Sequence, residues 1–351
     1  MSSPAQAGTP GTSGSSGSGL GGATMGAAGS GVAGTGNVAG NTATAGSGGS
    51  GDASAGAGSS GLGGSSAGMG GSHAGMGSAG MGSAGMGDAG GTTTTAPVLS
   101  PGCQKKTPRP TGGSVEVANT SLHLFPASYD GTKPYPLLIA LHACGNPNTE
   151  FVGLTKGTSF ETNYVRTFPN TPDSGQCWSN YTGDVARILS QYDDLTNNYC
   201  IDLNRVFAIA HSSGAQMLVN ILSHKTDAQH LNLKAVSPVA ADPFNVALPM
   251  PVLYIDGKMD NQRDASSAKN AVAKFRTANM CATTSKPYAP VMSCTSTDSG
   301  HPMVDPGCIT YDGCSVPTIW CSHNDPSYSG TQHGVPCFAI KSMYDFFASL
   351  P

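Results

Sequence analysis

Ser212 is the residue whose surroundings most clearly suggest chemistry. It lies in segment 210–214, AHSSG, which follows an apolar stretch and precedes helix-forming residues. This segment differs by one methyl group, at Ala210, from the pattern G-x-S-x-G, in which a serine occupies a sharp turn between a buried strand and a helix. The neighbours must be small because the strand and the helix pack closely there. The pattern therefore predicts a nucleophilic serine, with an ordinary strand-to-helix turn as the alternative.

Asp260 is the predicted acidic partner of this serine. In a site of this kind the acid follows the serine in the chain and lies just after a buried strand. Asp260 follows the apolar stretch 250–257. Asp256, in the same segment, is the competing candidate. The later position, after the glycine turn, suits a side chain that reaches towards a histidine, so Asp260 is preferred.

His333 is the predicted base. It lies after the last predicted strand and before the last predicted helix, in a loop from which an imidazole can reach back over the serine. His301 and His323 are the competing candidates. The imidazole would take the proton of Ser212 during attack, and the carboxylate of Asp260 would fix its tautomer and stabilise its charged form.

Acyl transfer by such a serine also needs backbone N–H donors for the developing oxyanion. One donor is expected from Ser213, the residue after the nucleophile, at the start of a helix. The other is expected from the loop after an earlier strand, in the segment LHACGN, where Cys144 or its neighbour Ala143 is the candidate. We expect no metal or other cofactor, because the histidines do not fall at ligand spacing and this chemistry needs none.

Short apolar runs that alternate with amphipathic segments predict the elements that position these residues. Continuous apolar runs indicate buried strands, and apolar residues at steps of three and four indicate helices. The predicted strands are 135–143, 164–169, 205–210, 233–241, 250–257 and 317–322, and the predicted helices are 185–195, 213–223, 266–279 and 338–350. This order predicts a doubly wound α/β fold, a mostly parallel sheet with helices on both faces, whose ligands bind at the carboxyl ends of the strands.

The first part of the chain has a different composition. Up to about Leu99 there is no Lys, Arg or Glu, and the segment is almost entirely Gly, Ser, Ala and Thr. Such a segment cannot bury enough apolar surface to offset the entropy of ordering its backbone. We therefore expect residues 1–102 to be a disordered spacer and residues 103–351 to form one domain.

All ten cysteines lie from Cys103 onward. An even number this high, without the CxxC pairs of a zinc site, predicts disulfides, whose pairing cannot be read from the sequence. No apolar run is long enough to span a bilayer, and no export signal is visible at the start of the chain. We expect an extracellular or cell-surface protein whose export signal has been removed. A net charge of −4 without a basic stripe argues against a nucleic-acid partner.

Four separate blocks of the sequence resemble a known family. They are FPASYDGTKPYPLLIALHACG, YCIDLNRVFAIAHSSGAQM, PVLYIDGKMD, and the region from CITYDGC to HGVPCFAIKSMYDFF. Over residues 114–350 the chain is similar to the secreted feruloyl esterase and poly(3-hydroxybutyrate) depolymerase-like serine esterases, the first family of carbohydrate esterases. The resemblance implies an α/β-hydrolase fold and a triad on Ser212, Asp260 and His333. It also implies that Cys177 and Cys200 belong to disulfides near the site.

The chain departs from this family at four positions. Ala143 and Ala210 stand where the family usually has glycine, and Asp256 stands where a histidine is common. Val335 follows the predicted catalytic-histidine loop at a position where a tryptophan is common. Each exchange is small, and all the proposed catalytic and oxyanion elements remain in place.

Two classes of function fit these observations. The first is a secreted serine esterase that hydrolyses feruloyl or acetyl esters of plant cell-wall polysaccharide, with depolymerisation of a polyester as the alternative. The second is a non-catalytic surface module that binds polysaccharide, presented away from a cell by the spacer as a tether. An intact triad favours the enzyme, because binding alone needs no nucleophile with its base and acid.

Overall fold

The computed structural model describes residues 96–351 except 118–120, 173–174, 263–264, 289–293, 295–306 and 326–330. The predicted spacer lies outside the described residues as far as residue 95, and so does His301. The boundary predicted at Cys103 lies too late, because the segment before it pairs with the domain. The carbonyl of Val98 accepts from the amide of Leu203 at 2.7 Å, and the amide of Ser100 donates to the carbonyl of Ile201 at 3.0 Å.

A single ten-stranded sheet forms the centre of the described part of the chain, in the order β1-β2-β4-β3-β5-β6-β7-β10-β9-β8. The strands are β1 (Ser114–Val117), β2 (Ser121–Leu124), β3 (Tyr135–Leu141), β4 (Val165–Pro169), β5 (Ile201–His211), β6 (Ala235–Val239), β7 (Val252–Gly257), β8 (Ser285–Pro287), β9 (Cys308–Tyr311) and β10 (Thr318–His323). The six central strands, which lie in the sheet in the order β4-β3-β5-β6-β7-β10, are parallel to one another. Antiparallel strands extend both edges, β2 and β1 on one side and β9 and β8 on the other.

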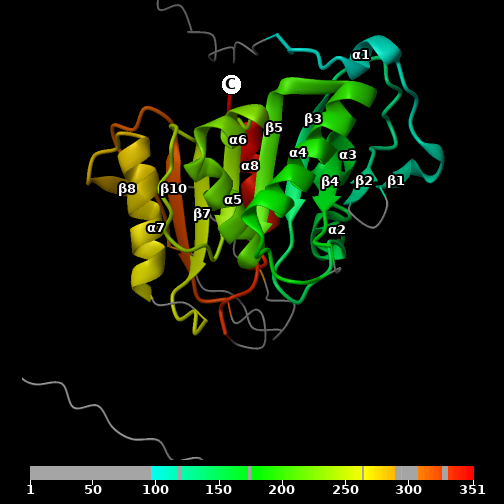
Figure 1. Cartoon of the computed structure of the whole chain (residues 1–351). Coiled ribbons are helices and arrows are strands. Elements are labelled where there is room, and N and C mark those ends of the chain that lie inside the picture. Colours follow the sequence, from blue (N-terminus) through cyan, green and yellow to red (C-terminus); the bar gives the residue numbers. More distant parts are fainter. Residues whose placement is uncertain are drawn as a thin grey trace, which may run out of the picture. The chain divides into compact units, whose positions relative to one another are not determined.

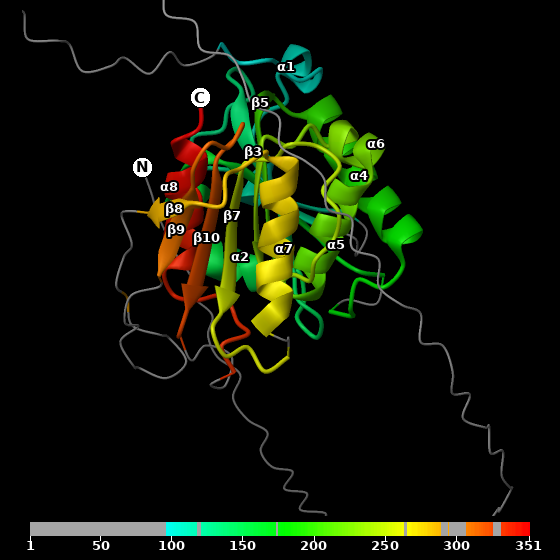
Figure 2. The ribbon, with the colours of Figure 1, turned by 90° about the vertical axis from the view of Figure 1, so that its left-hand side faces the viewer.

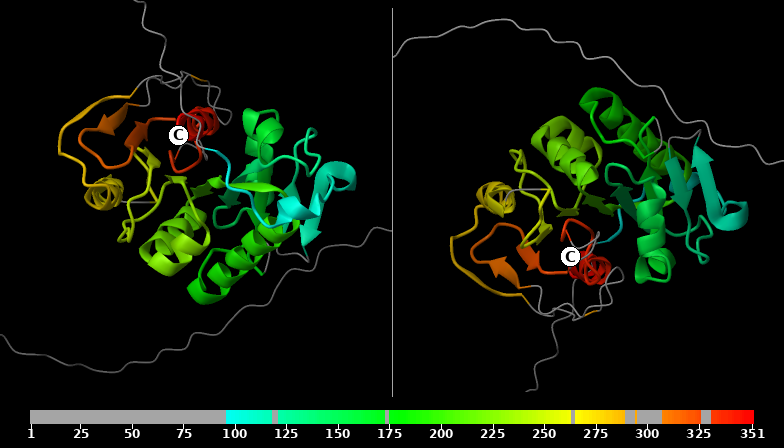
Figure 3. Two further views of the ribbon diagram at one scale, coloured as in Figure 1. Left: turned by 90° about the horizontal axis from the view of Figure 1, so that it is seen from above. Right: turned by 90° about the horizontal axis from the view of Figure 1, so that it is seen from below.

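Helices cover both faces of this sheet. They are α1 (Gly102–Lys105), α2 (Thr149–Thr155), α3 (Ser159–Asn163), α4 (Tyr181–Asn198), α5 (Ser213–Ser223), α6 (Lys225–His230), α7 (Ala265–Ala278) and α8 (Ala339–Ala348). Figure 1 shows α4, α5 and α7 in front of the sheet and α8 behind it, and Figure 2 shows α7 and α8 on opposite sides of β7 and β10. The views from above and below agree, with α8 in red across the strands from α7 in yellow (Figure 3).

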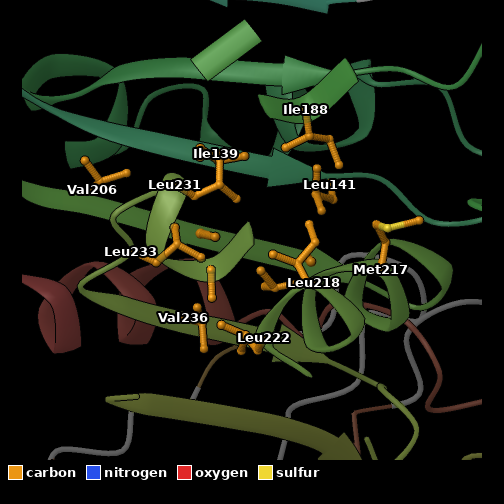
Figure 4. Close-up of a cluster of buried hydrophobic side chains, with 14 of the residues drawn as sticks. Ile139, Leu141, Ile188, Val206, Met217, Leu218, Leu222, Leu231, Leu233 and Val236 are labelled. Carbon is orange, nitrogen blue, oxygen red and sulfur yellow. The ribbon is translucent and has the colours of Figure 1, made fainter. Parts of the chain in front are cut away.

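The strand period of two divides the core between these two helical layers. In β3, Leu137, Ile139 and Leu141 pack on the face that carries α4, α5, α6 and α7. Leu138 and Ala140 point to the other face, against side chains of α2, α3 and α8. Figure 4 shows part of the first cluster, in which residues of α5 lie against β3 and β5. Both faces are buried, which explains why the central strands read as continuous apolar runs.

The predicted α/β-hydrolase type of fold, with a mostly parallel sheet and helices on both faces, is confirmed. Each predicted strand and helix overlaps an observed one, and α5 has the predicted bounds. Four edge strands and four short helices were not predicted. The edge strand β1 alternates between exposed and half-buried positions and β8 is exposed throughout, so neither has the continuous apolar run that marks the central strands.

The ten cysteines, all within the described residues, form five disulfides, in agreement with the sequence-based prediction. The pairs are Cys103–Cys200, Cys144–Cys177, Cys281–Cys314, Cys294–Cys337 and Cys308–Cys321. None of the described helices has the length and apolar character needed to cross a membrane.

Two of the histidines buried in the sheet, His123 and His323, make stability depend on pH. Burial lowers the pKa of His123 and of His323 to about 4, against opposing effects of nearby carboxylates. Both imidazoles are therefore neutral in the folded protein at neutral pH, whereas in the unfolded chain they bind a proton below about pH 6.5. Acid thus favours the unfolded state, starting below about pH 6.5 and reaching its full effect below about pH 4.

We expect each buried histidine to remove about 2 kcal/mol of the free energy of unfolding when the pH falls from 7.5 to 5. His123→Asn, which keeps an acceptor near the place of Nδ1, should reduce this loss by about that amount. Urea unfolding of the oxidised protein at the two pH values measures it, with His230→Asn as the same exchange at an exposed position. Equal losses in wild type and His123→Asn would contradict the account.

Candidate active site

Ser212 occupies a sharp turn at the carboxyl edge of the sheet, between the last residue of β5 and the first residue of α5. Its backbone has φ 51° and ψ −117°, a conformation that residues other than glycine rarely adopt. The Ser212 amide donates to the carbonyl of Val239 at the end of β6, at 2.9 Å, and its carbonyl accepts from the amide of Gln216 at 2.8 Å. The turn is therefore held between the neighbouring strand and the first turn of α5.

The small residues of the motif differ in importance. A Cβ atom on Gly214 would overlap the carbonyl oxygens of Leu141 and His142 at the end of β3. Ala210 is completely buried with its methyl group in place. The close approach of α5 to β3 thus requires the second glycine of the motif, whereas the first position accommodates alanine.

Ser212, His333 and Asp260 form a hydrogen-bonded chain. The Ser212 hydroxyl lies 2.8 Å from Nε2 of His333, and Nδ1 of His333 lies 2.7 Å from Oδ2 of Asp260. His333 and Asp260 are buried, while Ser212 is partly exposed. With Nδ1–H donated to the carboxylate, Nε2 is free to take the serine proton. The arrangement can therefore activate Ser212 as a nucleophile.

The two loops that carry Asp260 and His333 are fastened to each other. The amide of Met259 donates to the side-chain oxygen of Gln332 at 2.9 Å. Gly257 packs so closely on the Gln332 carbonyl that a Cβ atom there would overlap it. The other carboxylate oxygen of Asp260 accepts from the amide of Gln262 at 2.9 Å, which fixes the orientation of the acid.

The competing candidates lie elsewhere. Asp256 is within β7, and its neighbour across the sheet is Ser322 of β10. His323 is the last residue of β10, and its Nδ1 accepts from the amide of Asp325 at 3.2 Å. The carboxylate that bonds to His333 is that of Asp260.

The loop after β3 corrects one of the predicted oxyanion donors. The amide of Ala143 donates to Oε2 of Glu150 at 2.7 Å, so it is engaged within the protein. The amide of Gly145, on the other side of Cys144, donates to the carbonyl of Gly175 at 2.8 Å. Among the described residues, no acceptor is found for the amide of Cys144. Ala143 is therefore not a suitable donor, and Cys144 is the candidate from this loop.

Ser213 is the first residue of α5. The first four amides of a helix have no acceptor within it, and the helix start favours a negative charge. The predicted location of this donor, next to the nucleophile at a helix N-terminus, matches the structure. Ser213 and Cys144 thus provide a candidate pair of oxyanion donors from two different loops.

Trp178 and a disulfide hold the loop after β3. Trp178 donates from Nε1 to the carbonyl of His142 at 2.9 Å, and Cys144 is joined to Cys177. The disulfide at Cys177 therefore lies beside the candidate oxyanion loop. Cys200 lies just before the start of β5, at the end of that strand opposite Ser212, and it pairs with Cys103. This disulfide is therefore not beside the loop. The expectation that both disulfides lie near the site is wrong for Cys200.

Two further residues of the site were not predicted. Oε1 of Glu150 lies 2.6 Å from Nδ1 of His211, and Nε2 of His211 lies 2.9 Å from the backbone oxygen of His333. Burial alone would raise the pKa of Glu150, but the hydrogen bond and charge of His211 outweigh it, and the pKa is lowered. His211 belongs to the sequence motif as the residue before the nucleophile, although no role was predicted for it. Nothing in the sequence pointed to Glu150, because its partners are distant in sequence.

Gly214→Ala tests the close contact between α5 and β3. Because the new methyl group overlaps two backbone carbonyls, we expect the free energy of unfolding to fall by at least about 2 kcal/mol. Gly153→Ala in α2 is the matched control, since nothing lies within 4 Å of a Cβ atom there. That variant should be neutral or more stable by up to about 1 kcal/mol. Urea unfolding compares them, and a Gly214→Ala protein as stable as wild type would refute the contact.

Comparison with known proteins gives one sequence relative and several distant structural likenesses. No protein-family model matches the chain. Feruloyl esterase B of Thermothelomyces thermophilus is 26% identical over 110 residues, which cover 28% of this chain and 38% of that protein. The chain thus matches well under half of that relative's length.

Among solved structures, the acetyl xylan esterase from Aspergillus awamori matches with a TM-score of 0.45 and 14% identity, over 67% of this chain and 98% of that one. The Bacillus cereus carboxylesterase matches with a TM-score of 0.35 and 18% identity, over 41% of this chain and 75% of that one. The strand order and the turn at Ser212 establish an α/β-hydrolase type of fold, and the sequence relative supports the resemblance to feruloyl esterases.

Proposed function

We propose that this chain is a carboxylic ester hydrolase that acts through an acyl-enzyme on Ser212. The observation that carries the proposal is the hydrogen-bonded chain from Ser212 through His333 to Asp260. This arrangement supplies a nucleophile, a base and an acid that orients the base. The similarity to a feruloyl esterase supports the same class of reaction.

The reaction takes two steps. The Ser212 oxygen attacks the ester carbonyl while His333 takes its proton, and the amides of Ser213 and Cys144 bind the resulting oxyanion. Protonated His333 then gives its proton to the leaving alcohol, and the acyl group stays on Ser212. Water attacks this ester with the help of His333, which releases the carboxylic acid and restores the serine hydroxyl.

The substrate class that we propose is a feruloyl or acetyl ester of plant cell-wall polysaccharide. Its support is the set of four sequence blocks and the feruloyl esterase relative. We propose an extracellular or cell-surface location, which the five disulfides support, with the N-terminal spacer as a tether. Polyester is the alternative substrate.

A purely binding function fits the site less well. The left-handed backbone of Ser212 costs about 1–3 kcal/mol, and a surface that only binds polysaccharide gains nothing from it. Conformations of this kind are typical of active sites, where the surrounding structure holds them. The partly exposed serine beside a buried base and acid therefore favours catalysis over binding alone.

We expect the oxidised full chain to release ferulate from methyl ferulate, and Ser212→Ala to lower the rate by at least about 10³-fold, because the variant lacks the hydroxyl that is hydrogen-bonded to His333. Ser223→Ala is the matched control, since Ser223 lies at the far end of the same helix, bonded to the carbonyl of Asn220. Ferulate release is followed by chromatography, with 4-nitrophenyl acetate and poly(3-hydroxybutyrate) as parallel substrates.

The substrates separate the alternatives. Hydrolysis of the acetyl ester or the polyester without ferulate release would remove the feruloyl proposal and keep the esterase. A Ser212→Ala protein as active as wild type would end the assignment of the nucleophile. A folded wild-type protein that hydrolyses none of the three would favour the binding module.

A further inference from the structure

We infer that Glu150 and His211 act as a positioning pair. The pair fixes the loop after β3, the turn at the nucleophile and the loop that carries His333 relative to one another. The inference rests on the proposed function, since it concerns the same site. It assigns a role to one residue in the first turn of α2 and to the residue immediately before the nucleophile.

The pair connects three segments that are far apart in the sequence. One carboxylate oxygen of Glu150 accepts from the amide of Ala143 at 2.7 Å, and the other lies 2.6 Å from Nδ1 of His211. The opposite nitrogen of His211 donates to the carbonyl of His333 at 2.9 Å. A single chain of hydrogen bonds therefore runs from the residue before Cys144, past Ser212, to the backbone of the catalytic base.

Burial makes this chain strong and intolerant of gaps. The side chains of His211 and Glu150 are 2% and 11% exposed, so water cannot readily replace a lost partner. An unpaired polar group in such a place is destabilising, and the structure avoids this because both ring nitrogens and both carboxylate oxygens have partners. Movement of any one segment would break a hydrogen bond that links it to the others.

The chemistry of the ring fixes what the pair must contain. A carbonyl oxygen only accepts, so Nε2 of His211 carries a proton towards His333. Nδ1 then attracts Glu150 only when a second proton lies between them. A proton therefore lies on each side of the ring, one towards the carbonyl of His333 and one between Nδ1 and the Glu150 carboxylate. With both protons in place the pair has no net charge.

Neither residue is placed to react. The Ser212 hydroxyl donates to His333, and among the described residues the side chains of Glu150 and His211 bond to backbone groups, to each other and to Asn146 on the loop. Their effect must act through the position of the Cys144 amide and of the imidazole. Both matter more in the transition state than in the bound substrate, because the oxyanion forms only there.

Three substitutions of Glu150 separate this role from simple structural support. Glu150→Ala removes both acceptors, and we expect kcat to fall about 10- to 100-fold while KM changes less than about threefold. Glu150→Gln can still accept from Ala143 through its oxygen and donate to Nδ1 of neutral His211 through its NH₂ group, so it should recover most of the lost kcat. Glu150→Asp is one methylene shorter and should recover little.

Glu161→Ala is the matched control. Glu161 also lies in the first turn of a helix, accepts from a backbone amide, that of Gly157 at 2.6 Å, and pairs with Arg166. In the part of the chain that the structure describes, its hydrogen-bond and ion-pair partners lie outside the segments that carry the site. Removing it should leave kcat and KM within about twofold of wild type. Rates are divided by the concentration of titratable serine, so that misfolded protein does not lower the apparent kcat.

Hydrogen exchange of the Ala143 amide gives a readout that does not depend on activity. It should be slow in wild type and in Glu150→Gln and at least about tenfold faster in Glu150→Ala, because the carboxylate is its acceptor. The proposal fails if kcat of Glu150→Ala stays within threefold of wild type, or if Glu150→Gln is as impaired as Glu150→Ala. It also fails if only KM changes. If wild type hydrolyses no ester, the proposed function fails, whereas the exchange rates still report whether the link exists.

Discussion

The left-handed backbone of Ser212 is the constraint on which the rest of the site depends. Such a conformation persists only where the surroundings hold it, and here the surroundings are the Val239 carbonyl on β6, the first turn of α5, and the tight contact of Gly214 with β3. The core beneath α5 is correspondingly dense, with side chains of the helix packed on β3 and β5 (Figure 4). Packing of the sheet thus determines where the nucleophile stands.

The parallel arrangement of the central strands brings the other groups to the same edge. The loops after β3, β7 and β10 lie far apart in the sequence, yet each contributes one part of the site. Loops at this edge need fastening, and the structure uses different means for each. A disulfide and Trp178 hold the loop after β3, Gln332 joins the acid loop to the base loop, and Glu150 with His211 connects the oxyanion side to the base side.

Much of this arrangement could be predicted from the sequence, because central strands and the nucleophile turn have local signatures. The order of serine, acid and histidine along the chain placed Ser212, Asp260 and His333 where the structure brings them together. The edge strands were missed because they lack long apolar runs. The engagement of the Ala143 amide, the role of Glu150 and the far position of Cys200 depend on contacts between distant segments, which neither periodicity nor spacing reveals.

The measurement that tests the central claim most directly is covalent labelling of the oxidised full chain with a fluorophosphonate, followed by intact mass and peptide mapping. A serine activated by His333 and Asp260 should take up one equivalent, located on Ser212, and His333→Ala should take up almost none under the same conditions. A folded protein that takes up no label, or that carries it on other serines while Ser212 stays free, would contradict the account.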